Sequence, residues 1–401
     1  MRTPPPPAGA RGNNKRGLSV DDQAARAVRR GHPWVYREAV RGPLESFRAG
    51  DTATLTASDG TFLARAVVEP ASALAARVIT LDPRDDDDRA LVERKLRSAV
   101  GRRAALIDRS ETTALRLCNG EGDGLPGLVL DRYERWGVLR ADGEAALAFA
   151  RRHQDAIRAA LGDEVDGVML RPRDGSPEAW IGPVAPPVVV VREHGMAMHV
   201  DLHEGQKTGA FLDQRDNRRR VRQLSPGRRV LNLFSYAGGF SIAAALGGAS
   251  QVTSVDIAAG GHAAAQRSMR DNGVDPAKHR FVTADVFAFL TAARARGDRW
   301  DLVISDPPSF APNERTKPRA ISAYRKLHEA CRAVLAPGGL FAAASCSSHV
   351  GLDDFMTTLQ LDPPDLHVAE IHGQPPDHAV TPSWSEGRYL KFIVLQRDEP
   401  R

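Results

Sequence analysis

Two kinds of side chain in this 401-residue sequence could do chemistry: a thiol and a set of aspartates. Cys346 follows an apolar run, residues 340–345, which is typical of a buried strand and places the thiol at its carboxyl end. Asp256, Asp285 and Asp306 end or follow three other short apolar runs. Because the parallel strands of an α/β sheet present their carboxyl ends at the edge where ligands bind, we expect these groups to lie close together.

A thiol reacts as the thiolate, so a nucleophilic Cys346 would need a lowered pKa or a nearby base. The alternative is that Cys346 is a buried core residue, which is the usual role of a lone cysteine on a strand. Cys118 and Cys331 are interpreted as structural. The three cysteines lie far apart and match neither zinc-ligand spacing nor a disulfide framework, so we predict no metal site.

The elements that must position these residues follow a β-α-β-α-β pattern. Residues 230–240 read as a buried strand that passes through a Ser/Gly-rich turn into an alanine-rich helix. Gly238 and Gly239 would let the backbone approach a ligand at the N-terminus of that helix. Helical segments at 263–272 and 286–296 separate the strands that end in aspartate. The pattern predicts a doubly wound α/β domain with a parallel sheet.

The length of the chain indicates further domains before this one. Residues 17–89 carry short alternating strands spaced like a small β-barrel. Residues 90–191 read as a middle α/β domain with a helix, a hairpin around a Gly/Pro turn and a second helix over 145–161. Residues 192–401 would form the large α/β domain, and residues 1–16, with their proline run, a disordered leader.

Positive charge is unevenly spread, although the formal net charge is only +5. Residues 214–229 contain seven arginines and one aspartate. Such a cluster fits the phosphate backbone of a nucleic acid, and the alternative is a solvated surface. The overlapping segment 204–220 could fold over the mouth of a nucleotide pocket, and the alternative is that residues 213–222 are an exposed helix with mixed charges. The sequence has no long uncharged apolar segment and no signal-peptide core, so we expect a soluble cytoplasmic protein that does not bind membranes.

Six motifs, taken in order, resemble those of one known family. They are Gly-His-Pro-Trp-Val (31–35), Asn-Gly-Glu-Gly-Asp-Gly-Leu-Pro-Gly-Leu (119–128), Glu-Gly-Gln-Lys-Thr-Gly-Ala-Phe-Leu-Asp-Gln-Arg (204–215), Asn-Leu-Phe-Ser-Tyr-Ala-Gly-Gly-Phe-Ser (232–241), Asp-Pro-Pro-Ser-Phe (306–310) and Ser-Cys-Ser-Ser-His (345–349). The resemblance is to the bacterial ribosomal RNA large subunit methyltransferase I family, and it runs from about residue 18 to the C-terminus. The ordered set is far more specific than any single motif.

This resemblance implies three domains and one cofactor. The first unit would be a PUA domain, an RNA-binding pseudo-barrel in which Trp34 is expected to be a core aromatic, and the second a middle α/β domain. The C-terminal unit would be a class I, Rossmann-like methyltransferase domain that binds S-adenosylmethionine (SAM). Members of the family make 5-methylcytosine in 23S rRNA, so rRNA is the expected partner, and a homodimer is left open.

The family pattern places cofactor-binding residues on the first strand and its loop, at the ends of the following strands, and in the segment that covers the pocket. They are Asn232, Phe234, Ser235, Tyr236, Gly238, Gly239, Asp256, Asp285, Asp306, Gln206, Phe211 and Arg215. Asp256 is expected on the ribose hydroxyls, from which a carboxylate can accept hydrogen bonds, and Asp285 near the adenine. Substrate contacts are expected from Lys207, Pro307, Pro308 and Phe310.

The reaction that the resemblance implies gives Cys346 a catalytic role. Carbon 5 of cytosine is a poor nucleophile, so an enzyme that methylates it first adds a thiolate to carbon 6. Asp306 would hold the ring in its reactive protonation state or assist removal of the carbon-5 proton. The chain has Pro308 and Ser309 where many RNA 5-methylcytosine enzymes carry a second cysteine, and this departure leaves the methylated atom open.

Two other functions stay open. A related SAM-dependent enzyme could methylate a guanine or adenine nitrogen of rRNA, with Cys346 structural. The chain could also be a non-catalytic RNA-binding or assembly factor, although its glycine turn and strand-end aspartates are intact. A nicotinamide dehydrogenase is disfavoured, because no Gly-x-Gly-x-x-Gly fingerprint follows the first strand.

Overall fold

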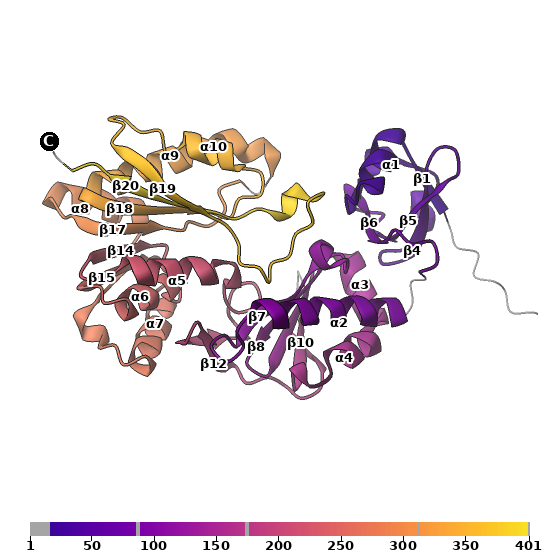
Figure 1. Cartoon of the computed structure of the whole chain (residues 1–401), viewed down its shortest axis with the longest axis horizontal. Coiled ribbons are helices and arrows are strands. Elements are labelled where there is room, and N and C mark those ends of the chain that lie inside the picture. The colour runs from indigo at the N-terminus through magenta and orange to yellow at the C-terminus, as the bar shows by residue number, and fades with distance from the viewer. Residues whose placement is uncertain (1–16, 86–88, 173–175, 312, 400–401) are drawn as a thin grey trace, which may run out of the picture.

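The computed structural model describes residues 17–85, 89–172, 176–311 and 313–399. The expected leader, residues 1–16, lies outside these ranges. Along the chain the elements form a small β unit, a middle α/β unit and a large α/β domain that carries the C-terminus (Figure 1). Among the described residues, no helix combines the length and the apolarity that crossing a membrane requires.

The first unit is built on one six-stranded sheet. Its elements are β1 (Gly17–Val20), α1 (Asp22–Arg29), β2 (Trp34–Tyr36), β3 (Val40–Arg41), β4 (Thr52–Thr56), β5 (Phe62–Val68) and β6 (Leu74–Thr80), in the strand order β2-β6-β5-β4-β1-β3. Asp21 is the N-cap of α1, and its side chain accepts a hydrogen bond from the amide of Ala24. Side chains along β4 alternate between buried and half-buried, as expected of a strand with one face on a core.

Trp34 lies between domains rather than in the apolar core of the first unit, which corrects the expectation of a core aromatic. Its indole Nε1 donates to Glu121 of the middle unit (2.9 Å). Its ring meets the ring of Trp384 edge-on, with 5.5 Å between centroids. A buried indole N–H needs a hydrogen-bond partner, and Trp34 finds that partner in another domain. The Gly-His-Pro-Trp-Val motif therefore contributes to a domain interface.

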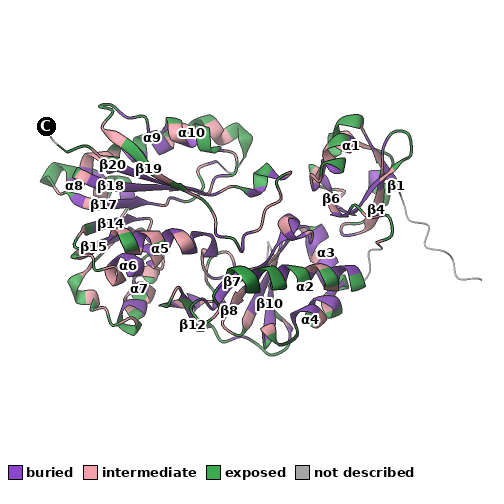
Figure 2. Ribbon diagram, viewed as in Figure 1, coloured by how far each residue is buried: buried purple, intermediate pink, exposed green. Residues whose placement is uncertain are grey.

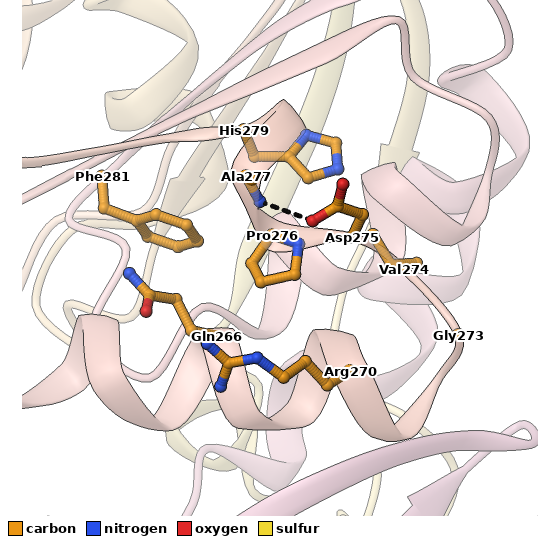
Figure 3. Close-up of a pocket in the computed structure, with 9 residues that line it drawn as sticks. All are labelled: Gln266, Arg270, Gly273, Val274, Asp275, Pro276, Ala277, His279 and Phe281. Atoms are coloured by element: carbon orange, nitrogen blue, oxygen red, sulfur yellow. Dashed lines mark hydrogen bonds between the residues drawn. The ribbon is translucent and has the colours of Figure 1, made fainter.

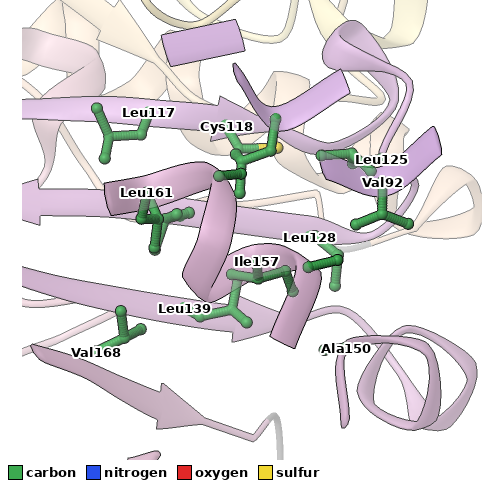
Figure 4. Close-up of a cluster of buried hydrophobic side chains, with 14 of the residues drawn as sticks. Val92, Leu117, Cys118, Leu125, Leu128, Leu139, Ala150, Ile157, Leu161 and Val168 are labelled. Atoms are coloured by element: carbon green, nitrogen blue, oxygen red, sulfur yellow. The ribbon is translucent and has the colours of Figure 1, made fainter. Parts of the chain in front are cut away.

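The middle unit has a five-stranded sheet in the order β11-β10-β9-β8-β7. Its elements are α2 (Arg89–Leu106), β7 (Ala114–Asn119), β8 (Leu128–Tyr133), β9 (Trp136–Ala141), α3 (Glu144–Arg152), α4 (Gln154–Leu161), β10 (Gly167–Arg171) and β11 (Glu178–Ile181). The helices and the sheet enclose an apolar core that includes Cys118 (Figure 4). The single helix expected over 145–161 is broken at His153, whose backbone (φ −105°, ψ 21°) leaves helical geometry while its ring packs on Phe149.

A two-stranded hairpin, β12 (Val188–Glu193) and β13 (Met196–Asp201), joins the middle unit to the large domain. The boundary expected at residue 191 falls inside this hairpin. One apolar cluster spans the middle unit, the hairpin and the large domain, and its members include Tyr133, Val138, Met169, Val191, Met198, Ile242 and Met269. Because this cluster is shared, the two units bury apolar surface against each other through the hairpin.

The large domain has a seven-stranded sheet in the order β16-β15-β14-β17-β18-β20-β19. Its elements are η5 (Leu212–Gln214), α5 (Arg215–Leu224), β14 (Arg229–Leu233), α6 (Gly239–Leu246), β15 (Gln251–Asp256), α7 (Ala259–Asp271), β16 (Arg280–Thr283), α8 (Val286–Arg296), β17 (Trp300–Ser305), α9 (Lys317–Val334), β18 (Leu335–Ser345), α10 (Leu352–Thr357), β19 (Leu366–His372) and β20 (Lys391–Arg397). Strands β14 to β18 pair in parallel, whereas β20 pairs antiparallel with β18 and β19.

Helices cover both faces of this sheet: α5, α6 and α7 lie on one face, and α8, α9 and α10 on the other (Figure 1). The central strands are consequently buried along most of their length (Figure 2). The strand order reverses between β14 and β17, and α/β folds bind ligands at such a point, outside the carboxyl ends of the strands. The prediction of a doubly wound α/β domain is confirmed.

The loop between β19 and β20, residues 373–390, contacts all three units, and we call it the C-terminal loop (Figure 1). One hydrogen bond to each unit illustrates this: Arg215 of the large domain donates to Asp377 (2.7 Å), Asn119 of the middle unit to the carbonyl of Ala379 (2.8 Å), and Ser383 to the carbonyl of Gly31 in the first unit (2.9 Å). The last part of the chain therefore joins domains that are far apart in sequence.

Gly122, in the short helix η3 (Gly120–Asp123), lies so close to the C-terminal loop that a Cβ would overlap the carbonyl group of Ala379. We predict that Gly122→Ala forces the loop away and lowers the free energy of unfolding by about 1–3 kcal/mol, the usual cost of overpacking. Calorimetric thermal unfolding measures the change. The control is Gly101→Ala in α2, where the added Cβ meets nothing within 4 Å and stability should rise by about 0.5–1 kcal/mol. Equal stability of G122A and wild type would contradict this contact.

Candidate active site

A cavity of about 310 Å³ opens at the carboxyl ends of β14, β15, β17 and β18, where the strand order reverses. Many of the predicted site residues line it: Gln206, Lys207, Phe211, Phe234, Ser235, Tyr236, Gly239, Asp256, Asp306, Pro307, Pro308 and Cys346. The thiol and two of the three strand-end aspartates thus surround one space. Residues of the segment before α5 also line it, so that segment covers the cavity instead of forming an exposed helix.

Asp256 holds the loop after β14 in shape. Its two carboxylate oxygens accept hydrogen bonds from the backbone amides of Tyr236 and Ala258, each at 2.8 Å. Phe234 (φ 56°) and Tyr236 (φ 46°) adopt left-handed backbone geometry, which costs about 1–3 kcal/mol per residue and concentrates at ligand sites. Each oxygen of Asp256 keeps a further lone pair, so the carboxylate can also accept from a ribose hydroxyl.

Two neighbouring residues make the same end of the cavity suitable for a nucleoside. Gly238 (φ 77°) is the N-cap of α6, and because a Cβ there would overlap the side chain of Ala265, only glycine fits. Ile257 is 75% exposed and lines the cavity beside Asp256, where it offers an apolar surface to a flat ring. A carboxylate for a ribose next to an apolar face for a purine fits the SAM that the sequence predicts.

The remaining predicted residues are not part of the cavity lining: Asn232, Gly238, Asp285, Arg215 and Phe310. Asn232 donates to the hydroxyl of Ser241 (2.8 Å) and so ties β14 to α6. Asp285 caps α8 by accepting from the amide of Ala288 (2.9 Å), and Phe310 packs on the ring of Tyr324. Direct contacts of these residues with cofactor or substrate stay predictions.

The thiol of Cys346 and the carboxyl group of Asp306 influence each other's ionisation. Burial, followed by the Asp306 carboxylate, raises the pKa of Cys346. Burial, followed by the carboxylate of Asp213, raises the pKa of Asp306 to about 7. Lys207 acts against both shifts, because its ammonium group favours the anionic forms. At neutral pH the thiol is therefore protonated, while Asp306 is poised to take up or release a proton.

Asp213 is a cavity residue that the sequence analysis does not single out. Its Oδ2 accepts a hydrogen bond from the Tyr389 hydroxyl (2.7 Å) and lies 3.4 Å from Lys207 Nζ. The Lys207 ammonium also sits 4.4 Å from the centroid of the Phe211 ring. Although burial opposes ionisation, Lys207 and His378 hold the pKa of Asp213 well below its usual range. Its place in the motif at 204–215 was the only sequence signal.

The loop that follows Cys346 is fixed by a lysine that the sequence analysis also misses. Lys391 is buried and donates to the backbone carbonyls of Ser347 (2.7 Å) and Val350 (2.6 Å), and burial lowers its pKa to about 8. The hydroxyl of Ser309, in the Asp-Pro-Pro-Ser-Phe motif, forms a hydrogen bond with that of Ser347 (3.0 Å). This contact ties the Asp-Pro-Pro loop to the loop that follows Cys346.

Arg171, the last residue of β10 in the middle unit, holds the segment that covers the cavity. Its guanidinium group donates four hydrogen bonds to backbone carbonyls of this segment: Gly205 (2.5 Å), Lys207 (2.7 Å), Leu202 (2.6 Å) and His203 (3.0 Å). The hydroxyl of Thr208 adds a bond to the buried Asp131 of β8 (2.6 Å). The middle unit contributes no predicted catalytic residue, yet it determines where Lys207 lies.

Several arginines of residues 214–229 form ion pairs within the protein. The pairs are Arg215 with Asp377 (2.7 Å), Arg218 with Glu193 (2.6 Å) and Arg220 with Glu370 (2.5 Å). The three carboxylates come from the C-terminal loop, β12 and β19. Arg215 and Arg218 are buried, so neither expectation holds for these two arginines, which pack α5 against its neighbours. The side chain of Arg220 is 33% exposed, and for this residue a contact with RNA stays a prediction.

Another hollow, of about 730 Å³, lies between the end of α7 and the start of β16 (Figure 3). Gln266 and Arg270 line one side, and Asp275, His279 and Phe281 the other. It sits at the amino ends of the strands, at the sheet edge opposite the thiol. Within the described ranges, no group of histidine, cysteine, aspartate and glutamate residues could hold a metal ion.

Two sequence profiles of known families match the chain: S-adenosylmethionine-dependent methyltransferase over residues 162–391, and PUA-like domain over residues 18–81. The ribosomal RNA large subunit methyltransferase of Deinococcus radiodurans is 39% identical over 402 residues, which cover 95% of this chain and 97% of that protein. The ribosomal RNA large subunit methyltransferase I of Serratia proteamaculans is 36% identical over 384 residues, covering 92% and 96%.

Solved structures are similar over nearly the same length. A protein from Streptococcus mutans, described as a SAM-dependent methyltransferase, superimposes with a TM-score of 0.86 at 25% identity and covers 95% of this chain and 100% of its own. A second structure with the same TM-score is of a methyltransferase complexed with S-adenosylhomocysteine (SAH).

The parallel strands β14 to β18 end at such a cavity, and the larger part of the chain matches the methyltransferase profile. Together with the PUA-like match near the N-terminus, these findings define a SAM-dependent methyltransferase with a PUA-like domain. The relatives place it more narrowly. At 39% and 36% identity over almost the whole chain, it belongs to the ribosomal RNA large subunit methyltransferase I family. The predicted family, the two domain types and the cofactor are confirmed.

We predict that Arg171→Lys weakens SAM binding by about tenfold or more. A lysine ammonium has only three N–H donors and cannot bond four carbonyls, and losing even one hydrogen bond to a charged group costs about 1.5 kcal/mol. Titration of the purified protein with SAM measures the dissociation constant. The control is Arg135→Lys, an exposed arginine of the same unit that pairs with Asp166 away from the cavity. Unchanged SAM affinity in R171K would show that the covering segment does not depend on this contact.

Proposed function

We propose that the protein methylates carbon 5 of a cytosine in 23S rRNA through a covalent bond between Cys346 Sγ and carbon 6 of that base. The observation that carries the proposal is the presence of the thiol, Asp306 and the glycine loop around one cavity. Family membership and the PUA-like profile support rRNA as the substrate. The Asp-Pro-Pro segment beside the thiol supports a flat base as the group that enters.

The residues suit each step of this reaction. Cys346 loses its proton to Asp306, and the thiolate adds to carbon 6 while the electron pair moves to ring nitrogen 3, which Asp306 protonates. The bound cofactor supplies an electrophilic methyl group. Carbon 5, now enamine-like, would attack that methyl group, and the electron pair of the broken S–CH3 bond would stay on sulfur, so that SAH is the leaving group. Loss of the carbon-5 proton to a base and of the nitrogen-3 proton then expels the thiolate and restores the ring.

Cys346 is the residue on which the proposal depends most directly. We expect Cys346→Ala to abolish transfer of labelled methyl from SAM to unmodified 23S rRNA while SAM binding stays within about threefold of wild type, because an alanine cannot add to the ring. Nucleoside analysis of the wild-type product should give 5-methylcytidine, and RNA containing 5-fluorocytidine should trap wild type covalently.

Cys331→Ala is the matched control, because Cys331 is fully buried in α9 and belongs to the apolar core. This variant should keep methylation and trapping even if its stability falls. Near-normal activity of C346A, or a product methylated on a purine nitrogen, would overturn the covalent mechanism.

The raised pKa values of Asp306 and Cys346 predict an unusual pH profile. The reactive form carries a thiolate and a protonated Asp306, which is one protonation state of a pair that shares a single proton. Because the pKa of Asp306 is about 7 and that of the thiol is higher still, kcat/KM should rise up to about pH 7, stay level, and fall only when the thiol ionises.

We expect Asp306→Asn to lower the rate by about 100-fold or more, the usual effect of losing a general acid. The variant should also lose the break near pH 7, so that its activity rises continuously until the thiol ionises. Single-turnover methyl transfer between about pH 5.5 and about pH 9.5, with both enzymes saturated with SAM, tests this. A break near pH 7 that persists in D306N would assign it to another group.

A further inference from the structure

Asp213 stands out among the charged residues of the cavity because half of its carboxylate is unused. The residue lies in η5, is only 4% exposed and lines the cavity together with Cys346, Asp306 and Lys207. Its Oδ2 accepts from Tyr389 and faces Lys207. Its Oδ1 has no hydrogen-bond partner within the part of the chain that the structure describes.

An unpaired oxygen on a buried carboxylate is costly, by roughly 1–3 kcal/mol or more for a charged group. Buried polar groups in proteins are otherwise nearly always paired, so an exception inside a ligand cavity indicates that a ligand provides the partner. The missing partner must be a hydrogen-bond donor, because an ionised carboxylate only accepts. Tyr389 and Lys207 fix the other oxygen and therefore leave Oδ1 with little freedom to turn away.

Asp213 lies at the thiol end of the cavity. Tyr389 donates to Asp213. The ammonium group of Lys391 donates both to the carbonyl of Tyr389 (2.8 Å) and to that of Ser347 (2.7 Å), the residue after Cys346. Asp256, by contrast, lies at the nucleoside end, beside Ile257. The donor that Oδ1 lacks is therefore expected on the substrate base that the thiol attacks.

We propose that Asp213 Oδ1 accepts a hydrogen bond from the exocyclic amine of the target cytosine and thereby selects cytosine over uracil. The inference rests on the proposed function. The amine is attached to carbon 4, on the same ring edge as carbons 5 and 6, and next to the nitrogen that Asp306 would protonate. The two aspartates would then bind neighbouring atoms of one base. Uracil would place a carbonyl oxygen against the ionised carboxylate, which is repulsive.

The test combines a conservative variant with a substrate that lacks the amine. Wild type and Asp213→Asn are each given an rRNA fragment that carries either cytosine or 2-pyrimidinone at the methylated position, and single-turnover rates are measured. The intrinsic reactivity of 2-pyrimidinone affects both enzymes equally and cancels in the comparison. The factor by which 2-pyrimidinone slows the reaction, relative to cytosine, should be at least about ten times larger for wild type than for D213N.

A purely structural role for Asp213 would lower both rates of the variant by one common factor. That result, with 5-methylcytidine still formed by wild type, would overturn this inference while leaving the proposed function intact. A D213N enzyme that loses SAM affinity in parallel with its rate would overturn it as well, because the carboxylate would then serve the ammonium group of the cofactor. Failure of the C346A test would instead remove the proposed function itself.

If D213N does not fold, Tyr389→Phe provides the same comparison. This variant keeps the carboxylate but removes the hydroxyl that fixes Oδ2, so the orientation of Oδ1 is lost. In this variant the factor by which 2-pyrimidinone slows the reaction should be at least about three times smaller than in wild type, because an oriented hydrogen bond to a charged group is weakened. An unchanged cost would contradict a role for Asp213 in reading the base.

Discussion

A single buried carboxylate, that of Asp377, connects the domains of this methyltransferase. It accepts two hydrogen bonds from the guanidinium of Arg215 in α5 and one from the backbone amide of Arg116 in β7, while Arg103 of α2 donates to its backbone carbonyl. Although burial opposes its ionisation, His378 and Arg215 hold the pKa of Asp377 well below the usual range. Separating such a pair leaves an uncompensated buried charge and costs about 3–5 kcal/mol, so the large domain and the middle unit hold together or both lose stability.

The cavity depends on this arrangement because its walls come from more than one unit. The covering segment is held by Arg171 and Asp131, which belong to the middle unit. Asp213 is oriented by Tyr389 at the end of the C-terminal loop. The large domain alone supplies the thiol and the strand-end aspartates. The neighbouring units supply the positions of the charged residues that control how those groups ionise.

The parts of this structure that could be predicted from sequence are those determined by nearby residues. Residues 286–296 form α8 as expected, since Asp285 caps its start and Gly297 takes the left-handed conformation at its end. The strand-end aspartates were recognisable because an apolar run predicts a strand, and the aspartate that follows the run must then lie at the carboxyl end of that strand. The break in the helix expected over 145–161 could not be predicted, because the packing of His153 on Phe149 does not change the hydrophobic pattern of the sequence.

Contacts between distant residues account for what sequence could not predict. Tyr389 and Asp213 are 176 positions apart, and nothing near either residue indicates the other. The arginines of α5 matched a phosphate-binding pattern because their partners, Glu193, Glu370 and Asp377, lie in other elements. Trp34 was expected in the core of the first unit because nothing in the sequence indicates that Glu121 and Trp384 are its neighbours.

The C-terminal loop also determines when the enzyme can become complete during its synthesis. Domains generally fold as they leave the ribosome, with the N-terminal ones first. Here the first two units can form early, but Asp377, which joins the middle unit to the large domain, and Tyr389, which orients Asp213, are translated after β19, when all strands of the large domain except β20 have been made. A nascent chain in which these residues are still inside the ribosome therefore has an incomplete cavity. The cavity becomes complete only after the C-terminal loop has left the ribosome and docked on the units that precede it.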